Sequence, residues 1–129
     1  MEQKLENLSI DLSQNLNDFS ICFNDEEISN ENIDDKVPIL SSKNFNIELR
    51  GAKFTFECEN DFFTLKQLCE LILKAWNSIL TKQQWDEMSL IMDMWEYEPT
   101  TCNLICQPTI LNGLDLNING FYYPIEMQD

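Results

Sequence analysis

The segment NFNIELRGAKFTFEC, residues 44–58, decides the fold that the sequence predicts. Apolar residues occupy alternate positions on both sides of Arg50-Gly51, and they are Phe45, Ile47, Leu49, Phe54, Phe56 and Cys58. Strict alternation is typical of a half-buried strand, and a glycine supplies the positive φ that a tight hairpin turn requires. The segment therefore predicts a β-hairpin with one apolar face.

The sequence directly after this hairpin predicts a core helix over residues 65–80. Thr64 and Gln67 have the spacing of a capping box, which places the first helical residue at Leu65. Apolar residues then recur at helical spacing, and they are Leu65, Leu68, Cys69, Ile72, Trp76, Ile79 and Leu80. We expect this stripe to pack across one face of the sheet.

A second helix, or a kinked continuation of the first, is predicted over residues 82–96. Thr81 and Gln84 repeat the capping pattern, and Pro99 prevents further helix. The acidic residues on this segment are Asp86, Glu87, Asp93 and Glu96. We expect them to lack a basic neighbour on the last turns of the helix, which leaves their charges uncompensated.

The N-terminal third predicts a helix, a short strand and a loop. Leucines and a phenylalanine recur at spacings of three and four, and they are Leu5, Leu8, Leu12, Leu16 and Phe19. This spacing predicts an amphipathic helix over residues 3–16. Residues 20–23 predict a short strand, and residues 24–36 an exposed acidic loop.

The C-terminal third predicts a return to β structure, as a meander that includes residues 114–118 and pairs with the hairpin 44–58. Residues 102–106 form a predicted strand, and Asn-Gly pairs at 112–113 and 119–120 predict type I′ hairpin turns. The predicted fold class is therefore α+β: a single domain over residues 1–129, in which an antiparallel hairpin and meander sheet packs against two to three helices.

The charge of the chain is unusual in amount and in distribution. Twenty-three acidic and eight basic residues give a formal net charge of −15. Residues 1–35 hold ten acids and one lysine, residues 36–82 five acids and seven bases, and residues 83–129 eight acids and no base. Negative charge concentrated at both ends of the chain predicts one or two acidic faces rather than a uniformly acidic surface.

The residue types exclude several classes of enzyme. The chain has no histidine, which removes the commonest general base, and its three glycines all stand at predicted turns. Cys102 and Cys106 lack the usual zinc spacing, and the acidic run from Asp25 lacks the glycine and glutamate of a calcium loop. We therefore predict no catalytic residue, no metal ligand and no cofactor.

The cysteines and the hydropathy pattern predict a cytoplasmic protein. An odd number of cysteines lies scattered in mostly apolar segments, namely Cys22, Cys58, Cys69, Cys102 and Cys106. This is typical of buried free thiols in a reducing compartment. The chain starts with acidic residues and has no run of about 20 apolar residues, so neither a secretory signal nor a membrane span is expected.

The candidate binding residues form two acidic clusters. The N-terminal cluster comprises Asp25, Glu26, Glu27, Glu31, Asp34 and Asp35. The C-terminal cluster comprises Asp86, Glu87, Asp93, Glu96 and Glu98 with the aromatic residues Trp95 and Tyr97. Aromatic residues among acids suit recognition of a basic partner. The alternative for the acids is a solvated surface. The three tryptophans lie on apolar stripes at helical spacing, which predicts a place in the core, and Trp95 with Tyr97 is the pair expected nearest to the surface.

Charge and size together favour a protein-binding function. A small acidic body is steered toward basic clefts, which are common in proteins that bind nucleic acid. The sequence favours an inhibitor that occupies the basic cleft of a nuclease or similar enzyme, either a toxin immunity protein or a phage-encoded anti-CRISPR-type inhibitor. A chaperone for a basic secreted effector and a small enzyme remain alternatives. Direct binding to nucleic acid is disfavoured because phosphates would be repelled.

Overall fold

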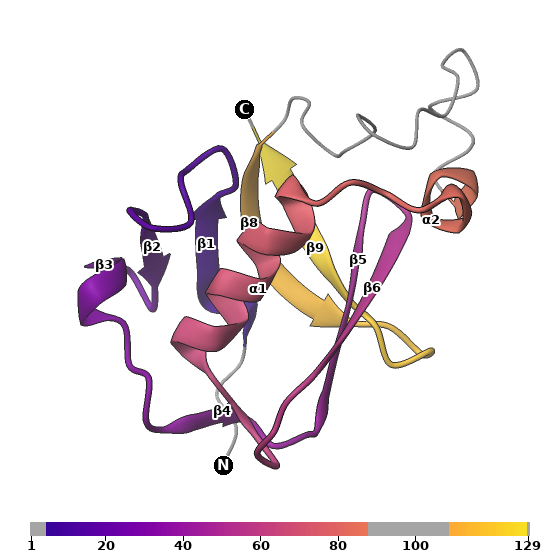
Figure 1. Cartoon of the computed structure of the whole chain (residues 1–129). Helices are drawn as coiled ribbons and strands as arrows, with labels where there is room; N and C mark the ends of the chain where they lie inside the picture. Colours follow the sequence, from indigo (N-terminus) through magenta and orange to yellow (C-terminus); the bar gives the residue numbers. More distant parts are fainter. Residues whose placement is uncertain (1–4, 88–108, 129) are drawn as a thin grey trace.

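The computed structural model describes residues 5–87 and 109–128 (Figure 1). In chain order the elements, with η for a short 3-10 helix, are η1 (Leu5–Asn7), β1 (Leu8–Asp11), β2 (Ser20–Phe23), β3 (Glu26–Ser29), η2 (Asn30–Asn32), β4 (Pro38–Leu40), β5 (Asn44–Leu49), β6 (Ala52–Glu57), β7 (Phe63–Thr64), α1 (Leu65–Asn77), α2 (Lys82–Glu87), β8 (Ile110–Leu116) and β9 (Tyr122–Gln128).

The described part of the chain is mostly β structure. Strands account for 44% and helices for 24% of the described residues, and α1 alone among their helices has seven or more residues. The predicted α+β class, with two to three helices on a sheet, is therefore wrong. Much of the error comes from N-terminal residues that were expected to form a helix and instead form strands.

The sheet has seven strands in the order β3-β2-β1-β8-β9-β5-β6, so β3 and β6 are its outer strands. Neighbouring strands are antiparallel except β9 and β5, which run parallel and meet at the pair Ile47–Tyr122. A separate two-stranded sheet joins β4 to β7. The predicted pairing of hairpin 44–58 with the C-terminal strands is confirmed, but the sheet is mixed rather than purely antiparallel.

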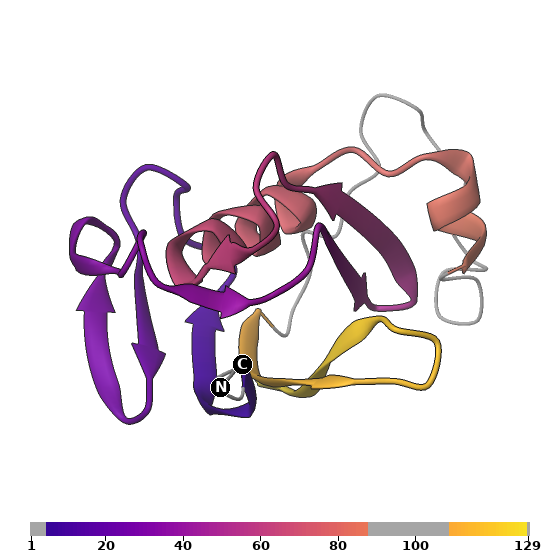
Figure 2. The same cartoon turned by 90° about the horizontal axis from the view of Figure 1, so that it is seen from below.

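The core lies where α1 crosses one face of the sheet (Figures 1 and 2). The helix buries one stripe of side chains, namely Leu65, Leu68, Cys69, Ile72, Leu73, Ala75 and Trp76. On the sheet side the ring of Phe45 lies 6.5, 6.1 and 5.8 Å from the rings of Phe56, Phe63 and Tyr122, measured between centroids. These contacts tie β5, β6, β7 and β9 into one core.

The start of α1 is the one that the sequence predicts. The backbone N–H of Gln67 donates to Thr64 Oγ1 at 3.3 Å, and the N–H of Thr64 donates to Gln67 Oε1 at 2.8 Å.

The helix α1 ends earlier than predicted, because Ser78 is extended with φ −77° and ψ 153°. Thus α2 is a separate helix rather than a kinked continuation of α1. Its predicted extension over residues 88–96 lies outside the described residues, as does the predicted strand 102–106.

Replacing Thr64 by alanine is expected to lower the free energy of unfolding by about 1–2 kcal/mol, because it removes the cap of the core helix. Thr81→Ala is the matched control, since Thr81 forms the same reciprocal bonds with Gln84 but is exposed at the start of the short α2. We expect a loss below about 0.5 kcal/mol there, because the cap of a short surface helix supports little tertiary packing. Urea denaturation measures both losses, and equal losses would contradict the prediction.

The predicted helix over residues 3–16 is wrong. Residues 5–7 form a 3-10 turn, and β1 then pairs with β2 on one side and β8 on the other. Leu8, Ile10 and Leu12 are all buried, which is the two-residue period of a strand. A helix with the leucine stripe inward would have turned Ile10 to solvent. The strand buries it, so tertiary pairing decides the conformation.

The predicted acidic loop 24–36 is partly wrong as well, because β3 and η2 lie within it. Asn24 and Asp25 have φ of 53° and 66° and join the paired residues Phe23 and Glu26. Two central residues with positive φ form a type I′ turn, which matches the right-handed twist of paired strands. The hairpin β2–β3 therefore carries much of the acidic segment.

The two Asn-Gly pairs differ in outcome. Gly113 has φ +78° but lies inside β8, so the turn predicted at 112–113 is wrong. Gly120 does lie in the turn between β8 and β9, where its N–H donates to the carbonyl of Asn117 at 3.1 Å. Asn119 has no positive φ, so this is a type I turn followed by a left-handed glycine rather than type I′.

Candidate functional site

The N-terminal acidic cluster lies at one edge of the sheet, on β3 and the segment that follows it (Figure 1). Asp25 stands in the β2–β3 turn, Glu26 and Glu27 on β3, Glu31 on η2 and Asp34 in the next loop, and all five are exposed. We call these residues the β3 acidic surface. Within the described ranges no ion pair joins any of them to a basic side chain.

Asp34 is held in its charged form by the backbone. The N–H groups of Lys36 and Val37 donate to Asp34 Oδ1 at 2.8 and 3.0 Å. Hydrogen bonds first from Lys36 and then from Val37 lower the pKa of Asp34, and the positive charge of Lys36 adds a smaller effect. A lowered pKa means that this carboxylate stays ionised to lower pH than an ordinary aspartate.

Asp35 has a different role from its neighbours in the N-terminal cluster. It is exposed, but its Oδ1 accepts a hydrogen bond from Thr64 Oγ1 at 2.9 Å, and Thr64 caps α1. The loop is fixed further by the N–H of Lys66, which donates to the carbonyl of Asp34 at 3.2 Å. Asp35 therefore attaches the acidic loop to the start of α1, and we leave it out of the β3 acidic surface.

A groove of about 280 Å³ lies between β3 and the loop that leads to β4. Its lining combines apolar and polar residues, namely Phe23, Asn24, Glu26, Ile28, Asn32, Asp34, Val37, Pro38, Ile39 and Leu65. Phe23, Ile39 and Leu65 are buried and form its floor, whereas Glu26 and Asp34 are exposed at its rim. Sequence reasoning missed this groove because it depends on the turn that folds β3 back onto β2.

The C-terminal acidic cluster is only partly described, and its described part lies elsewhere. Asp86 and Glu87 belong to α2, which packs against β6 at the opposite edge of the sheet. Lys82 Nζ lies 2.7 Å from Asp86 Oδ1, so the expectation that Asp86 lacks a basic neighbour is wrong. The other five candidate residues of this cluster lie outside the described residues, namely Asp93, Trp95, Glu96, Tyr97 and Glu98.

The tryptophans and Cys69 are predicted to lie in the core. Trp76 and Trp85 are buried in the core as predicted, and Trp95 is outside the described residues. Cys69 is buried, and burial, followed by the charge of Glu70, raises the pKa of its thiol to about 12. A thiol with so high a pKa stays protonated and unreactive at neutral pH.

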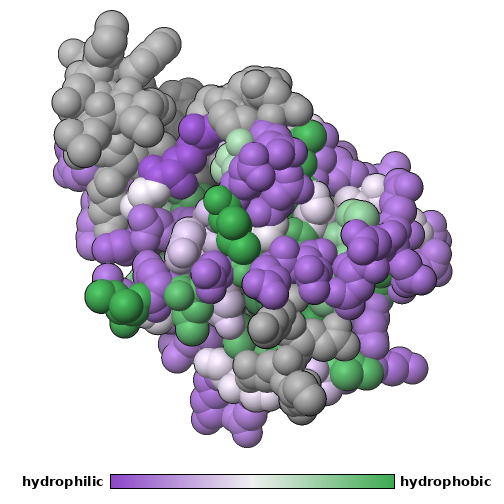
Figure 3. Space-filling view, turned by 180° about the vertical axis from the view of Figure 1, so that it is seen from behind, coloured by the Kyte–Doolittle hydropathy of each residue, from purple (hydrophilic) through white to green (hydrophobic). Residues whose placement is uncertain are grey.

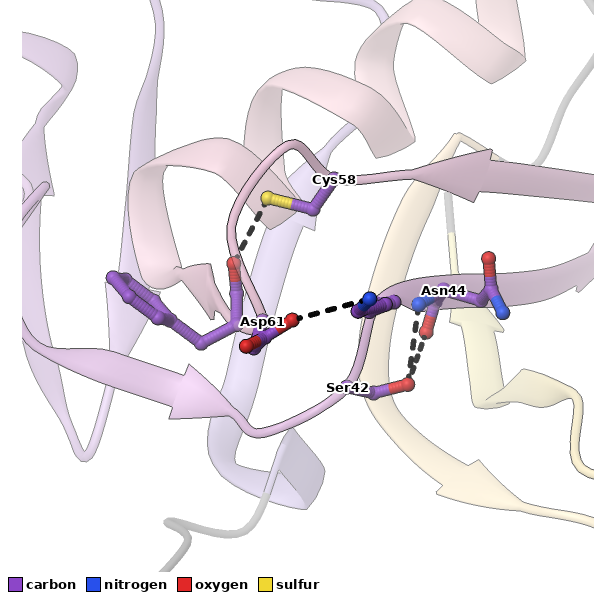
Figure 4. Close-up of polar contacts among 6 residues, drawn as sticks. Ser42, Asn44, Cys58 and Asp61 are labelled. Carbon is purple, nitrogen blue, oxygen red and sulfur yellow. Dashed lines mark hydrogen bonds and ion pairs between the residues drawn. The ribbon is translucent and has the colours of Figure 1, made fainter.

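The other described cysteines are less buried than predicted. Cys58 is half-buried, and its Sγ donates to the carbonyl of Phe62 at 2.9 Å within the β6–β7 loop (Figure 4). Cys22 is exposed, so the prediction of buried thiols is wrong for this residue. Its place in β2 explains this, because the residues on either side, Ile21 and Phe23, face the core.

Two other surfaces are weaker candidates. A groove of about 470 Å³ beside α1 contains Cys58, but Lys74 balances part of the charge of its acidic residues, Glu57, Glu59 and Glu70. The face opposite α1 is mostly hydrophilic with separated apolar residues (Figure 3). Exposed apolar side chains that occur singly are ordinary on protein surfaces. Neither surface concentrates one sign of charge as the β3 edge does.

Among residues 5–87 and 109–128, no group of three or more histidine, cysteine, aspartate or glutamate side chains could hold a metal ion. In the same residues no helix is long and apolar enough to cross a membrane.

Comparison with protein-family models, with curated proteins and with solved structures gave no match.

Proposed function

We propose that this protein is an acidic binding protein that inhibits a nucleic-acid-processing enzyme by occupying its basic cleft. A nuclease toxin opposed by an immunity protein, or a defence nuclease opposed by a phage-encoded inhibitor, would be such a target. The observation that carries the proposal is the β3 acidic surface, in which exposed carboxylates gather at one sheet edge without an ion pair among the described residues.

The chemistry of the surface fits a cleft that binds phosphates. Carboxylates at the rim would accept the charge-assisted hydrogen bonds that arginine and lysine otherwise donate to a nucleic-acid backbone. A one-signed surface also raises the association rate with an oppositely charged cleft by about 10–10³-fold.

Among the described candidate residues, the β3 acidic surface suits a contact surface better than Asp86 on α2 does. Asp86 already has a partner in Lys82, and α2 lies at the far edge of the sheet from β3. A single rigid cleft would therefore contact one of these surfaces rather than both. The carboxylates of the β3 acidic surface repel one another in the free protein, and a cationic partner would relieve that repulsion.

The proposal is tested by identifying the partner and assaying its activity. The full chain is immobilised, proteins bound at low salt are identified, and each purified partner is assayed on its nucleic-acid substrate with and without the full chain. We expect inhibition that excess nucleic acid relieves, and an affinity that falls at least about tenfold between ~50 and ~150 mM salt, because screening weakens exposed charge pairs.

Three results would contradict the proposal. They are a partner without a basic cleft, inhibition that nucleic acid does not relieve, and an affinity that salt does not change. A stable dimer that binds an unfolded basic segment would instead support the chaperone alternative.

A further inference from the structure

The two outer strands of the sheet differ in how their edges are covered. At β6, helix α2 packs alongside the strand, and Gln84 Nε2 donates to the backbone carbonyl of Lys53 at 2.9 Å. At β3, in the part of the chain that the structure describes, no comparable element lies against the outer edge. An uncovered edge strand presents backbone donors and acceptors that another strand can pair with.

The hydrogen bonds around β2 show which backbone groups of β3 point outward. The N–H of Asn30 donates to the carbonyl of Phe19 at 2.8 Å, so residues 19 and 30 form a bonded pair. Ser20, the next residue, directs its own N–H and carbonyl to the side chain of Gln14, each at 2.9 Å, and so away from β3. Its partner across the ladder is Ser29.

Antiparallel pairs alternate between bonded and non-bonded, so Glu27 directs its N–H and its carbonyl away from β2, and Ser29 directs its N–H away as well. The carbonyl of Ser29 is not counted among these groups, because Ser29 is the N-cap residue of η2. These groups form a short row along the open edge of the sheet. Every second residue of β3 is thus available for main-chain pairing, whereas Glu26 and Ile28 use their backbone groups within the hairpin.

The groove beside β3 defines the side chains that an added strand would carry. Its floor is apolar, and the exposed Val37, with 57% of its surface accessible, forms part of its wall. The carboxylates of Glu26 and Asp34 stand at the rim. A lysine or arginine fits this combination, since its aliphatic stem packs on apolar surface while its cationic end reaches a carboxylate.

We propose that β3 binds an extended, basic segment of the partner protein as an additional strand of the sheet. Main-chain bonds to Glu27 and Ser29 would supply the pairing, and lysine or arginine side chains would enter the groove or lie beside Glu27. A second copy of this chain does not fit, because Glu26 and Glu27 of two β3 strands would then oppose like charges. The inference rests on the proposed function and specifies how its partner is held.

Ser29→Pro removes the outward N–H with little other change. Ser29 has φ −74°, which is within the range of proline, and its N–H makes no bond within the hairpin. Ser29→Ala is the matched control, because both variants lose the bond that Asn32 Nδ2 donates to Ser29 Oγ at 3.0 Å, and only the proline loses the N–H.

The probe is a synthetic peptide of alternating lysine and valine, acetylated and amidated, added to the full chain. We expect amide exchange at Glu27 and Ser29 to slow at least about tenfold on binding, because main-chain pairing protects these N–H groups. Ser29→Pro should bind the peptide at least about fivefold more weakly than Ser29→Ala, since it loses one main-chain bond. Equal affinities, unprotected amides, or no binding at millimolar peptide would overturn the inference.

The same variants separate this inference from the proposed function. If Ser29→Pro inhibits the identified enzyme as well as Ser29→Ala, while reversal of the charges of Glu26 and Glu27 abolishes inhibition, the edge pairing is wrong and the charge-based function stands. If all of these variants inhibit as the wild type does, both are wrong.

Discussion

Replacing Gly113 by alanine is expected to lower the free energy of unfolding by about 3 kcal/mol, whereas Gly120→Ala should lower it by about 1 kcal/mol. Both glycines have positive φ, +78° and +83°, so alanine is disfavoured at either position. A Cβ at Gly113 would lie 2.8 Å from the carbonyl oxygen of Glu6 and 2.9 Å from Ile125 Cδ1. At Gly120 nothing lies within 4 Å.

The two positions therefore separate backbone strain from steric overlap. The left-handed conformation costs each alanine about 1–2 kcal/mol, and overpacking adds about 1–3 kcal/mol at Gly113 alone. The overlap at Glu6 involves backbone, which cannot rotate away as a side chain can. Urea denaturation of both variants gives the difference, and equal losses would show that the close approach of η1 to β8 is relieved by a small shift.

Gly113 also explains why the sequence misled the fold prediction at this point. Asn-Gly is typical of a hairpin turn, and Gly113 has the positive φ that such a turn needs at its second central residue, although Asn112 does not have it at the first. Here that φ bends β8 instead, so that Leu111 and Leu114 are both buried although they stand three positions apart in one strand. Local chemistry predicts the dihedral angle, but the pairing of β8 with β1 and β9 decides how the chain uses it.

Elements with strong local determinants could be predicted, and elements defined by long-range pairing could not. Hairpin 44–58 and the cap at Thr64 follow from alternation and side-chain bonds within a few residues. By contrast, β1 depends on partners in β2 and β8, and the latter lies about a hundred residues further on. Leucine spacing fits both a helix and a strand there, and only tertiary contacts distinguish them.

In the candidate site, too, the features that depend on local sequence could be predicted and those that depend on tertiary contacts could not. Charge counting along the chain identified the acidic residues, and the structure places those at 25–34 on one exposed edge. Charge counting could not show that Asp35 is bonded to Thr64, that Asp86 pairs with Lys82, or that a groove adjoins β3. These depend on side-chain directions and on segments brought together by the fold.

The double substitution Glu26→Lys with Glu27→Lys is expected to slow association with the partner by about 10–10³-fold, since it removes the field that steers a basic cleft. Both residues are exposed on β3 and have no ion pair among the described residues, so the fold should survive. Less self-repulsion should leave the melting temperature unchanged or slightly raised. Association rates are measured by stopped-flow or surface binding at low and physiological salt.

The matched control is Asp115→Lys with Glu126→Lys, which makes the same change of net charge on β8 and β9, away from the β3 edge. Because screening limits the interaction between exposed charges to about 8 Å at physiological salt, the control should slow association far less at that salt than the β3 variant does. The gap between the two should narrow at low salt, where distant charges also contribute. If both variants slow association equally at every salt concentration, total charge alone governs the encounter, and the β3 acidic surface is not the contact site.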